Sequence, residues 1–163
     1  MTRTTKGILA VVTIGAVSTL GMAIMVFNRG FSAKAEPLAI EAFVARHVRR
    51  LAIPAHAASA PNPVPATEDV MTGGMRHFAD HCAVCHANDG SGDTDFGRNM
   101  YPKPPDLRLP PTQSLSDGEL FYIIANGIRF TGMPAFGTGT EQGARDTWML
   151  VRFMRHLPKL TPE

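Results

Sequence analysis

The hydrophobic positions of the chain form one unbroken run near its start and helical patterns in the rest. Residues 8–27 are 20 consecutive positions without a charged residue, proline, asparagine or glutamine. As a helix they would span about 30 Å at 1.5 Å per residue, which matches the hydrocarbon thickness of a bilayer. We therefore expect a single transmembrane helix at 8–27, preceded by a short N-terminus at 1–7.

A cleavable signal peptide is the alternative interpretation of the same run. Ala33-Lys34-Ala35 has the small-x-small form of a cleavage site. The apolar run is longer than the ~7–15 residues of a signal-peptide core, which favours a retained anchor. Cleavage after Ala35 stays open. Lysine and arginine lie on both sides of the run, so charge alone does not orient it.

Residues 28–53 form a juxtamembrane segment whose pattern predicts an amphipathic helix over 38–53. Its apolar residues recur at helical spacing, and Arg46, Arg49 and Arg50 share the opposite face. Such a helix either lies on an anionic membrane surface or serves as a solvated or partner-packed linker. The apolar stripe consists of Ile40, Phe43, Val44, Val48 and Leu51.

Residues 54–66 contain four prolines, five alanines and no charge. This composition is typical of a semi-rigid, extended spacer. We expect the segment to link the membrane-proximal part to a folded domain at 67–163.

The pattern over 67–163 predicts helices and thus an all-α domain. Thr67 can cap a helix that carries Gly74 and Phe78 on one face. Ser116-Asp117-Gly118-Glu119 is a capping box, and the helix after it ends at Gly127. A third apolar face runs over 141–156, with Trp148, Leu150, Val151, Phe153 and Met154.

The net charge changes sign at the start of the predicted domain. Residues 1–66 carry seven Lys/Arg and two Asp/Glu, a net charge of +5, whereas residues 67–163 carry nine Lys/Arg and twelve Asp/Glu, a net charge of −3. A nucleic-acid binder concentrates positive charge on its folded part, so no nucleic-acid partner is expected. Asp89, Asp93 and Asp95 fall in a Gly/Asp stretch that fits an acidic surface loop better than a calcium loop.

The most specific pattern is Cys82-Ala83-Val84-Cys85-His86, the attachment signature of c-type haem. Two thiols one helical turn apart can each add to a vinyl group of the porphyrin, and the next residue, His86, can then ligate the iron. A redox dithiol would need a βαβ context, and a zinc site would need a fourth ligand. One motif predicts one covalent haem c with its iron.

With this motif, residues 67–160 resemble the class I cytochrome c family. Gly74, Phe78 and Cys82 reproduce the spacing of the family's first helix, and Leu150 and Phe153 match its last helix. The resemblance implies the cytochrome c fold, with a close crossing of these two helices at Gly74. It also implies that Pro105 of the family's Pro-x-Leu motif, or its neighbour Pro104, accepts a hydrogen bond from the His86 ring.

The second axial ligand is expected to be Met133. It lies in an irregular loop between glycines and a proline, and its Gly-Met-Pro motif resembles the ligand loop of bacterial family members. Met100 is the other loop methionine, and the alternative for Met133 is a residue that packs under the ring without ligation. Arg129 precedes the loop and is a candidate partner of a haem propionate, or else a solvated arginine.

These residues predict a one-electron carrier of the respiratory type and not an enzyme. Because bacteria attach haem c outside the cytoplasm, the resemblance implies a single-pass inner-membrane protein with a cytoplasmic N-terminus and a periplasmic haem domain. Two propionates would bring the domain to about −5, so its redox donor and acceptor at the membrane should present a basic docking patch. The alternatives are a fixed subunit of a dehydrogenase or oxidase complex, or a haem enzyme or sensor with an open distal site.

Overall fold

The computed structural model describes residues 2–30 and 32–160, which fall into two separate units, 1–35 and 36–163. The first unit is α1 (Arg3–Arg29), whose N-cap Thr2 accepts a hydrogen bond from the Thr5 amide at 3.2 Å. Within it, Arg3–Asn28 is long and apolar enough to cross a membrane, and its side chains are exposed. The predicted anchor therefore exists as a candidate membrane-spanning helix.

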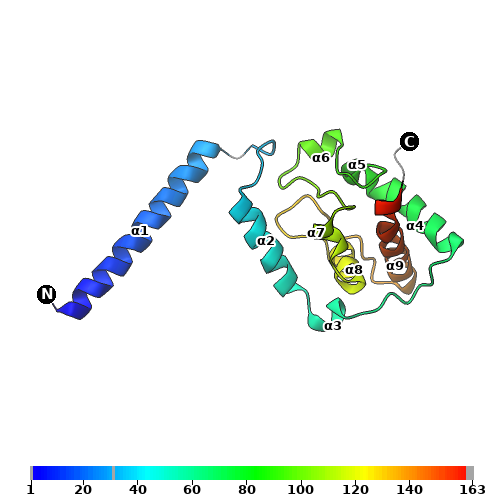
Figure 1. Cartoon of the computed structure of the whole chain (residues 1–163), viewed down its shortest axis with the longest axis horizontal. Coiled ribbons are helices and arrows are strands. Elements are labelled where there is room, and N and C mark those ends of the chain that lie inside the picture. Colours follow the sequence, from blue (N-terminus) through cyan, green and yellow to red (C-terminus); the bar gives the residue numbers. More distant parts are fainter. Residues whose placement is uncertain (1, 31, 161–163) are drawn as a thin grey trace. The chain divides into compact units, whose positions relative to one another are not determined.

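The described residues of the second unit form helices joined by loops, with no strand among them, which confirms the predicted all-α fold (Figure 1). Its elements, in chain order, are α2 (Ala39–Ala52), α3 (Ala55–Ala58), α4 (Glu68–His81), α5 (Ala83–His86), α6 (Asp95–Arg98), α7 (Pro110–Gln113), α8 (Asp117–Asn126), α9 (Glu141–His156) and a short 3-10 helix (Leu157–Lys159).

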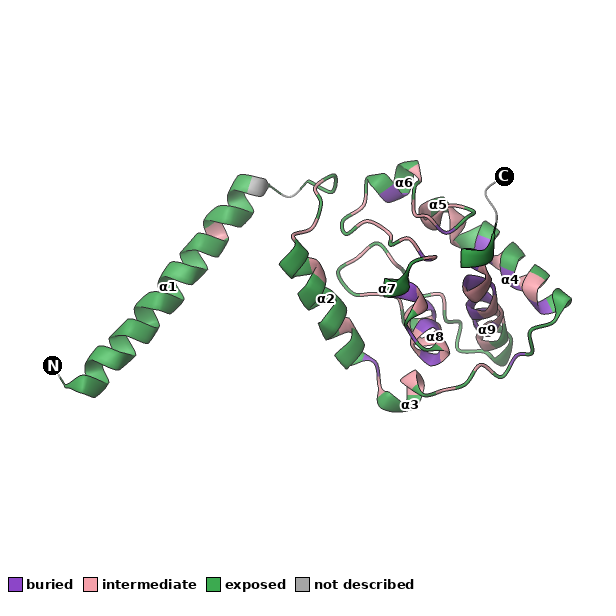
Figure 2. Cartoon of the chain, viewed as in Figure 1, coloured by how far each residue is buried: buried purple, intermediate pink, exposed green. Residues whose placement is uncertain are grey.

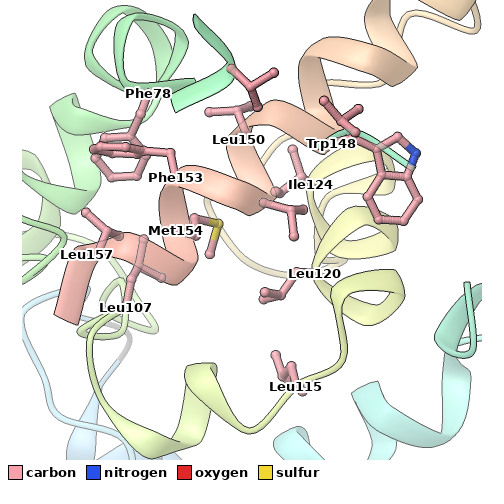
Figure 3. Close-up of a cluster of buried hydrophobic side chains, with 13 residues drawn as sticks. Phe78, Leu107, Leu115, Leu120, Ile124, Trp148, Leu150, Phe153, Met154 and Leu157 are labelled. Atoms are coloured by element: carbon pink, nitrogen blue, oxygen red, sulfur yellow. The ribbon is translucent and has the colours of Figure 1, made fainter. Parts of the chain in front are cut away.

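Helices α4 and α9 cross at a point where their backbones touch. A Cβ added at Gly74 would overlap the backbone carbonyl oxygen of Met149 and lie 2.9 Å from its carbonyl carbon. Beside the crossing, the rings of Phe78 and Phe153 pack with their centroids 5.2 Å apart (Figure 3). The close crossing expected at Gly74 is confirmed.

Helix α8 completes the core on the other side of α9. The Ser116–Glu119 capping box forms as predicted, with the Ser116 amide donating to Glu119 at 2.6 Å and the Glu119 amide donating to Ser116 Oγ at 3.0 Å. Phe121 of α8 stacks on Trp148 of α9 with centroids 4.2 Å apart. Figure 2 shows the buried residues gathered on the facing sides of α8 and α9.

Residues 54–66 differ from the expected extended spacer, because they pack against the helical core. The carbonyl of Val64, a residue that is 4% exposed, accepts a hydrogen bond from Arg152 at 2.8 Å. Asn62 donates to the Trp148 carbonyl at 3.0 Å, and Ser116 Oγ donates to the Ala58 carbonyl at 2.5 Å. Proline removes amide donors but keeps carbonyl acceptors, so side chains of other elements can fix such a segment.

Helix α2 belongs to the same unit and contacts it through its polar residues. Tyr101 donates to Glu41 at 2.5 Å, and Arg50 contacts Glu119 and the Ser114 carbonyl, each at 3.3 Å. Lys103 also pairs with Glu36, just before the helix. The apolar stripe predicted on α2 forms and stays exposed.

The crossing predicts opposite outcomes for two neighbouring glycines. We expect Gly74→Ala to lower the free energy of unfolding by about 2 kcal/mol, because the new methyl overlaps backbone that cannot move aside. Gly73→Ala is the matched control, since there the added Cβ meets only the flexible end of Met149. That variant should be neutral or stabilised by up to about 1 kcal/mol through helix propensity. Equal losses in denaturant unfolding of the two haem-loaded variants would contradict the crossing.

Candidate haem site

The five residues of the haem motif form a single tight turn at the end of α4. Cys82 is both the C-cap of α4 and the N-cap of α5. Its carbonyl accepts hydrogen bonds from the backbone amides of Cys85 at 3.1 Å and His86 at 2.9 Å. Ala87, with φ at 62°, then turns the chain away. The two cysteines carry free thiols and are half-buried. The turn thus brings both thiols and the imidazole together, as two thioether bonds and an iron ligand require.

Burial shifts the pKa values of Cys82 and His86. It raises the pKa of the Cys82 thiol to about 11, with a smaller contribution from the neighbouring Cys85. Burial also lowers the pKa of His86, which outweighs the raising effect of the Pro105 backbone carbonyl. The imidazole is therefore held neutral, the form that can ligate a metal.

The backbone carbonyl that acts on the His86 ring is that of Pro105 rather than Pro104. It lies near the ring, yet within the described residues no group completes a hydrogen bond of ordinary geometry to the buried His86 Nδ1. A metal bound at the other ring nitrogen would orient the imidazole and make use of this carbonyl.

The segment around Pro105 is fixed from two sides. The Leu107 amide donates to the Gly90 carbonyl at 2.8 Å, which joins the segment to the loop that follows the haem motif. Gln113 Nε2 then donates to the carbonyls of Leu107 at 2.7 Å and Met154 at 3.0 Å, which joins it to α9. Sequence reasoning missed Gln113, because both of its partners are backbone carbonyls, which carry no sequence signature.

The Met133 loop folds back onto the end of α8. Ile128 donates to the Met133 carbonyl at 3.1 Å, and Phe136 donates to the Ile124 carbonyl at 3.0 Å. Gly127 has φ at 67°, and a Cβ there would lie 2.7 Å from the Met133 carbonyl oxygen. The half-buried Met133 packs against the hydrophobic core.

The structure also brings Met100 next to this loop. A Cβ added at Gly132 would overlap the terminal methyl of Met100. The Met100 side chain therefore lies against the loop that carries Met133, the predicted ligand. Arg129, the predicted propionate partner, is exposed.

The acidic loop is neutralised by arginines that the sequence analysis did not connect to it. Arg108 pairs with Asp89 at 2.7 Å and with Asp106 at 2.8 Å, and Arg98 pairs with Asp93 and with Asp95. The hydrogen bonds from Arg108 hold the pKa of Asp106 below its ordinary value. Those acidic side chains are thus balanced locally, which weakens their contribution to an acidic docking surface.

Comparison with known proteins decides the family. Residues 69–154, more than half of the 163, match the family model described as cytochrome c oxidase, cbb3-type, subunit III. The chain belongs to this family of c-type cytochrome domains. The resemblance to class I cytochromes c is thereby confirmed, and with it covalent haem c and its iron as the cofactors of the domain.

Two further comparisons are less informative about function. Among curated proteins, none matches this cytochrome c chain. Among solved structures, a chain of the reducing HAO-like protein complex Kustc0457/Kustc0458 from Kuenenia stuttgartiensis is similar, with a TM-score of 0.50 and 20% sequence identity. The likeness covers 58% of this chain and 46% of that chain, which is less than half of its length. At this identity it shows the fold alone.

Two glycines with the same backbone strain test how closely the Met133 loop approaches α8. Gly127→Ala and Gly139→Ala both place a side chain at positive φ, at 67° and 72°, which costs about 1–2 kcal/mol each. Only at Gly127 does the new Cβ also meet backbone atoms of the Met133 loop, whereas Gly139 faces open space. We expect Gly127→Ala to lose about 1–3 kcal/mol more in the free energy of unfolding. Equal losses would contradict the close approach.

Proposed function

We propose that this cytochrome c domain is a one-electron carrier of the respiratory type, held at the periplasmic face of the bacterial cytoplasmic membrane by α1. One observation carries the proposal: two thiols and an imidazole whose Nδ1 is buried share one turn within a domain of the c-type cytochrome family. When bound, haem c supplies an iron that exchanges a single electron between Fe(III) and Fe(II).

The residues of the chain have separate roles in this proposal. Cys82 and Cys85 would hold the cofactor covalently, and His86 would ligate the iron while Pro105 orients its ring. Met133 would supply the second ligand, and a thioether ligand favours the reduced state. With both residues bound to the iron, no coordination position would remain open to a substrate, as a carrier rather than an enzyme requires.

The location follows from the chemistry of attachment together with α1. Haem c is joined to its protein outside the bacterial cytoplasm, so α1 would run with residues 1–7 inside and the haem domain in the periplasm. A donor and an acceptor at the membrane then exchange electrons with the domain in turn. The net charge of −3 on residues 67–163 supports partners with a basic docking patch.

A fixed subunit of a larger redox complex is the second candidate function. The matched family is described as an oxidase subunit, and the similar solved chain is part of a protein complex. The apolar stripe of α2, which stays exposed in the isolated chain, also supports a permanent partner. In this case the electron transfer is the same, but the donor or the acceptor is bound permanently.

The axial ligand is tested by a pair of methionine variants. We expect Met133→Ala to abolish the weak far-red charge-transfer band of the oxidised protein, because that band reports sulfur bonded to the iron. The reduced variant should also bind carbon monoxide, and the reduction potential should fall. Met100→Ala should keep all three properties of the parent. The opposite pattern would assign the ligand to Met100, and carbon monoxide binding by the parent itself would favour the enzyme or sensor alternative.

The choice between carrier and subunit is tested in native membranes. We expect the haem protein, extracted in mild detergent and separated by size, to elute as the single chain with its micelle, because a shuttle binds its partners only transiently. Haem absorbance identifies the fractions, and the mass of the purified chain shows whether cleavage after Ala35 occurs. Co-elution with a large redox complex, stable to moderate salt, would instead establish the subunit function.

A further inference from the structure

Two buried side-chain nitrogens lack a hydrogen-bond partner within the described part of the chain, and they belong to different kinds of residue. One is Nδ1 of His86, the predicted iron ligand, and the other is Nε of Arg49 in α2. Arg49 is half-buried and its guanidinium is always charged, and a buried N–H without an acceptor costs free energy. His86 Nδ1 lies at the haem site, so a bound cofactor accounts for its missing partner. Arg49 Nε needs a hydrogen-bond acceptor of its own.

Within the described residues, no carboxylate forms a hydrogen bond or ion pair with Arg49. Burial has the largest effect on the pKa of this guanidinium and lowers it, and the charges of Arg46 and Arg50 lower it further. Glu119 is the carboxylate that acts on it favourably, but this carboxylate already accepts bonds from Arg50 at 3.3 Å and from the Ser116 amide at 2.6 Å. Arg49 and Arg50 thus share one carboxylate that already has two hydrogen-bond donors.

Arg49 lies on the side of α2 that faces away from the exposed apolar stripe. On a helix with 3.6 residues per turn, it lies about 100–180° from each residue of that stripe. All residues of the stripe are exposed, whereas Arg49 is half-buried and its Nε is fully buried. Because α2 also contacts the rest of the domain through Glu41 and Arg50, Arg49 occupies the inner face of the helix.

The segments that hold α2 also border the haem site. At one end, Tyr101 and Lys103 immediately precede Pro105, whose carbonyl acts on His86. At the other end, Ser114 and Glu119 lead into α8, whose C-terminal end carries the Met133 loop. In the view of Figure 1, α2 runs beside the chain that joins α6 to α8.

The cofactor brings the missing anions. Haem carries two propionate carboxylates on the side of the porphyrin away from the vinyl groups that Cys82 and Cys85 capture. A planar carboxylate matches the fork of a guanidinium, which can form two parallel hydrogen bonds with it. We propose that Arg49 of α2 binds a haem propionate, so that the juxtamembrane helix forms part of the haem pocket.

This assignment goes beyond both the family match and the sequence analysis. The matched residues 69–154 do not include α2. The predicted propionate partner was Arg129, which is exposed, whereas Arg49 is partly buried with an orphan nitrogen. The inference requires only that haem c is bound, and it is independent of whether the protein is a free carrier or a fixed subunit.

The test compares charge at two positions of one helix, in the full-length haem-loaded chain in detergent. The variants are Arg49→Gln, Arg49→Lys and, as the matched control, Arg46→Gln, which removes an exposed charge from the same helix. The readouts are the midpoint potential as a function of pH and the infrared carbonyl band of the protonated propionate. The far-red charge-transfer band shows in each variant whether the axial ligation proposed above is intact.

We expect Arg49→Gln to raise the pKa of one propionate, because the carboxylate loses its cationic partner. The extra negative charge near the iron disfavours reduction, so the equilibrium constant for reduction at neutral pH should fall about tenfold, or about 59 mV. The potential should recover as the pH falls through the raised pKa, since protonation removes that charge. Arg49→Lys keeps a positive charge, so its propionate pKa and its potential should lie between those of the parent and of Arg49→Gln. Arg46→Gln should leave the propionate pKa unchanged.

Other titratable groups on α2 or in contact with it and its preceding turn are present in every variant and do not produce this pattern. They are Glu36, Glu41, Arg50, Tyr101, Lys103 and Glu119. An unchanged propionate band and pH profile in Arg49→Gln would overturn the assignment, as would an equal response of Arg46→Gln. If the far-red band is absent from the parent, the axial assignment fails while the propionate comparison still decides the role of Arg49. If Arg49→Gln does not retain haem, the propionate pKa and the potential of Arg49→Lys are compared with those of the parent instead.

Discussion

The backbone contact between α4 and α9 at Gly74 fixes the geometry on which the haem site depends. Helix α4 leads directly into the Cys82–His86 turn, so its axis determines where the thiols and the imidazole lie. Helix α9 holds the opposing segment, because the Met154 carbonyl accepts from Gln113, which also binds the Leu107 carbonyl. A wider crossing would separate the His86 ring from the Pro105 carbonyl that influences it. A glycine therefore controls the site without touching it.

Buried nitrogens without partners link the stability of this fold to its cofactor. A polypeptide normally satisfies its buried polar groups, and each exception costs free energy. Among the side chains that the structure describes, the exceptions are an imidazole nitrogen at the haem motif and a guanidinium nitrogen on α2. Binding of a group that satisfies either of them stabilises the folded state relative to the unfolded chain. The haem-loaded domain is therefore expected to be more stable than the polypeptide alone, beyond the effect of the two covalent bonds.

The parts of this structure that the sequence predicts well are those with local signals. The Ser116–Glu119 capping box, the end of α8 at Gly127 and the haem motif are all decided within a few residues. The helix pattern of α2 was equally readable. The orientation of this helix on the domain was not readable, because Arg46, Arg49 and Arg50 share one face of the helical wheel. Only contacts with distant residues such as Tyr101 and Glu119 distinguish the half-buried Arg49 from the exposed Arg46 and Arg50.

The Pro/Ala segment at 54–66 was hard to predict for a related reason. Its composition indicates an extended chain, but four of its residues form α3, and composition does not say whether such a chain is free or packed. The decisive groups, Asn62 and Arg152, bond to backbone carbonyls that carry no sequence signature. Similarly, Arg108 lies 19 residues from Asp89, so nothing in the local pattern connects the pair.

The packing of this segment changes how electron transfer at a membrane would work. With residues 36–66 folded onto the haem domain, the chain between the two helices is the nine residues 30–38, which can extend to about 30 Å at most. If α1 spans the membrane as proposed, the haem domain stays within that distance of it. A short connection restricts the domain to a small volume and raises its effective concentration toward partners embedded in the same membrane. It disfavours partners that need a long reach into the periplasm, so the donor and acceptor should present their redox centres near the membrane surface.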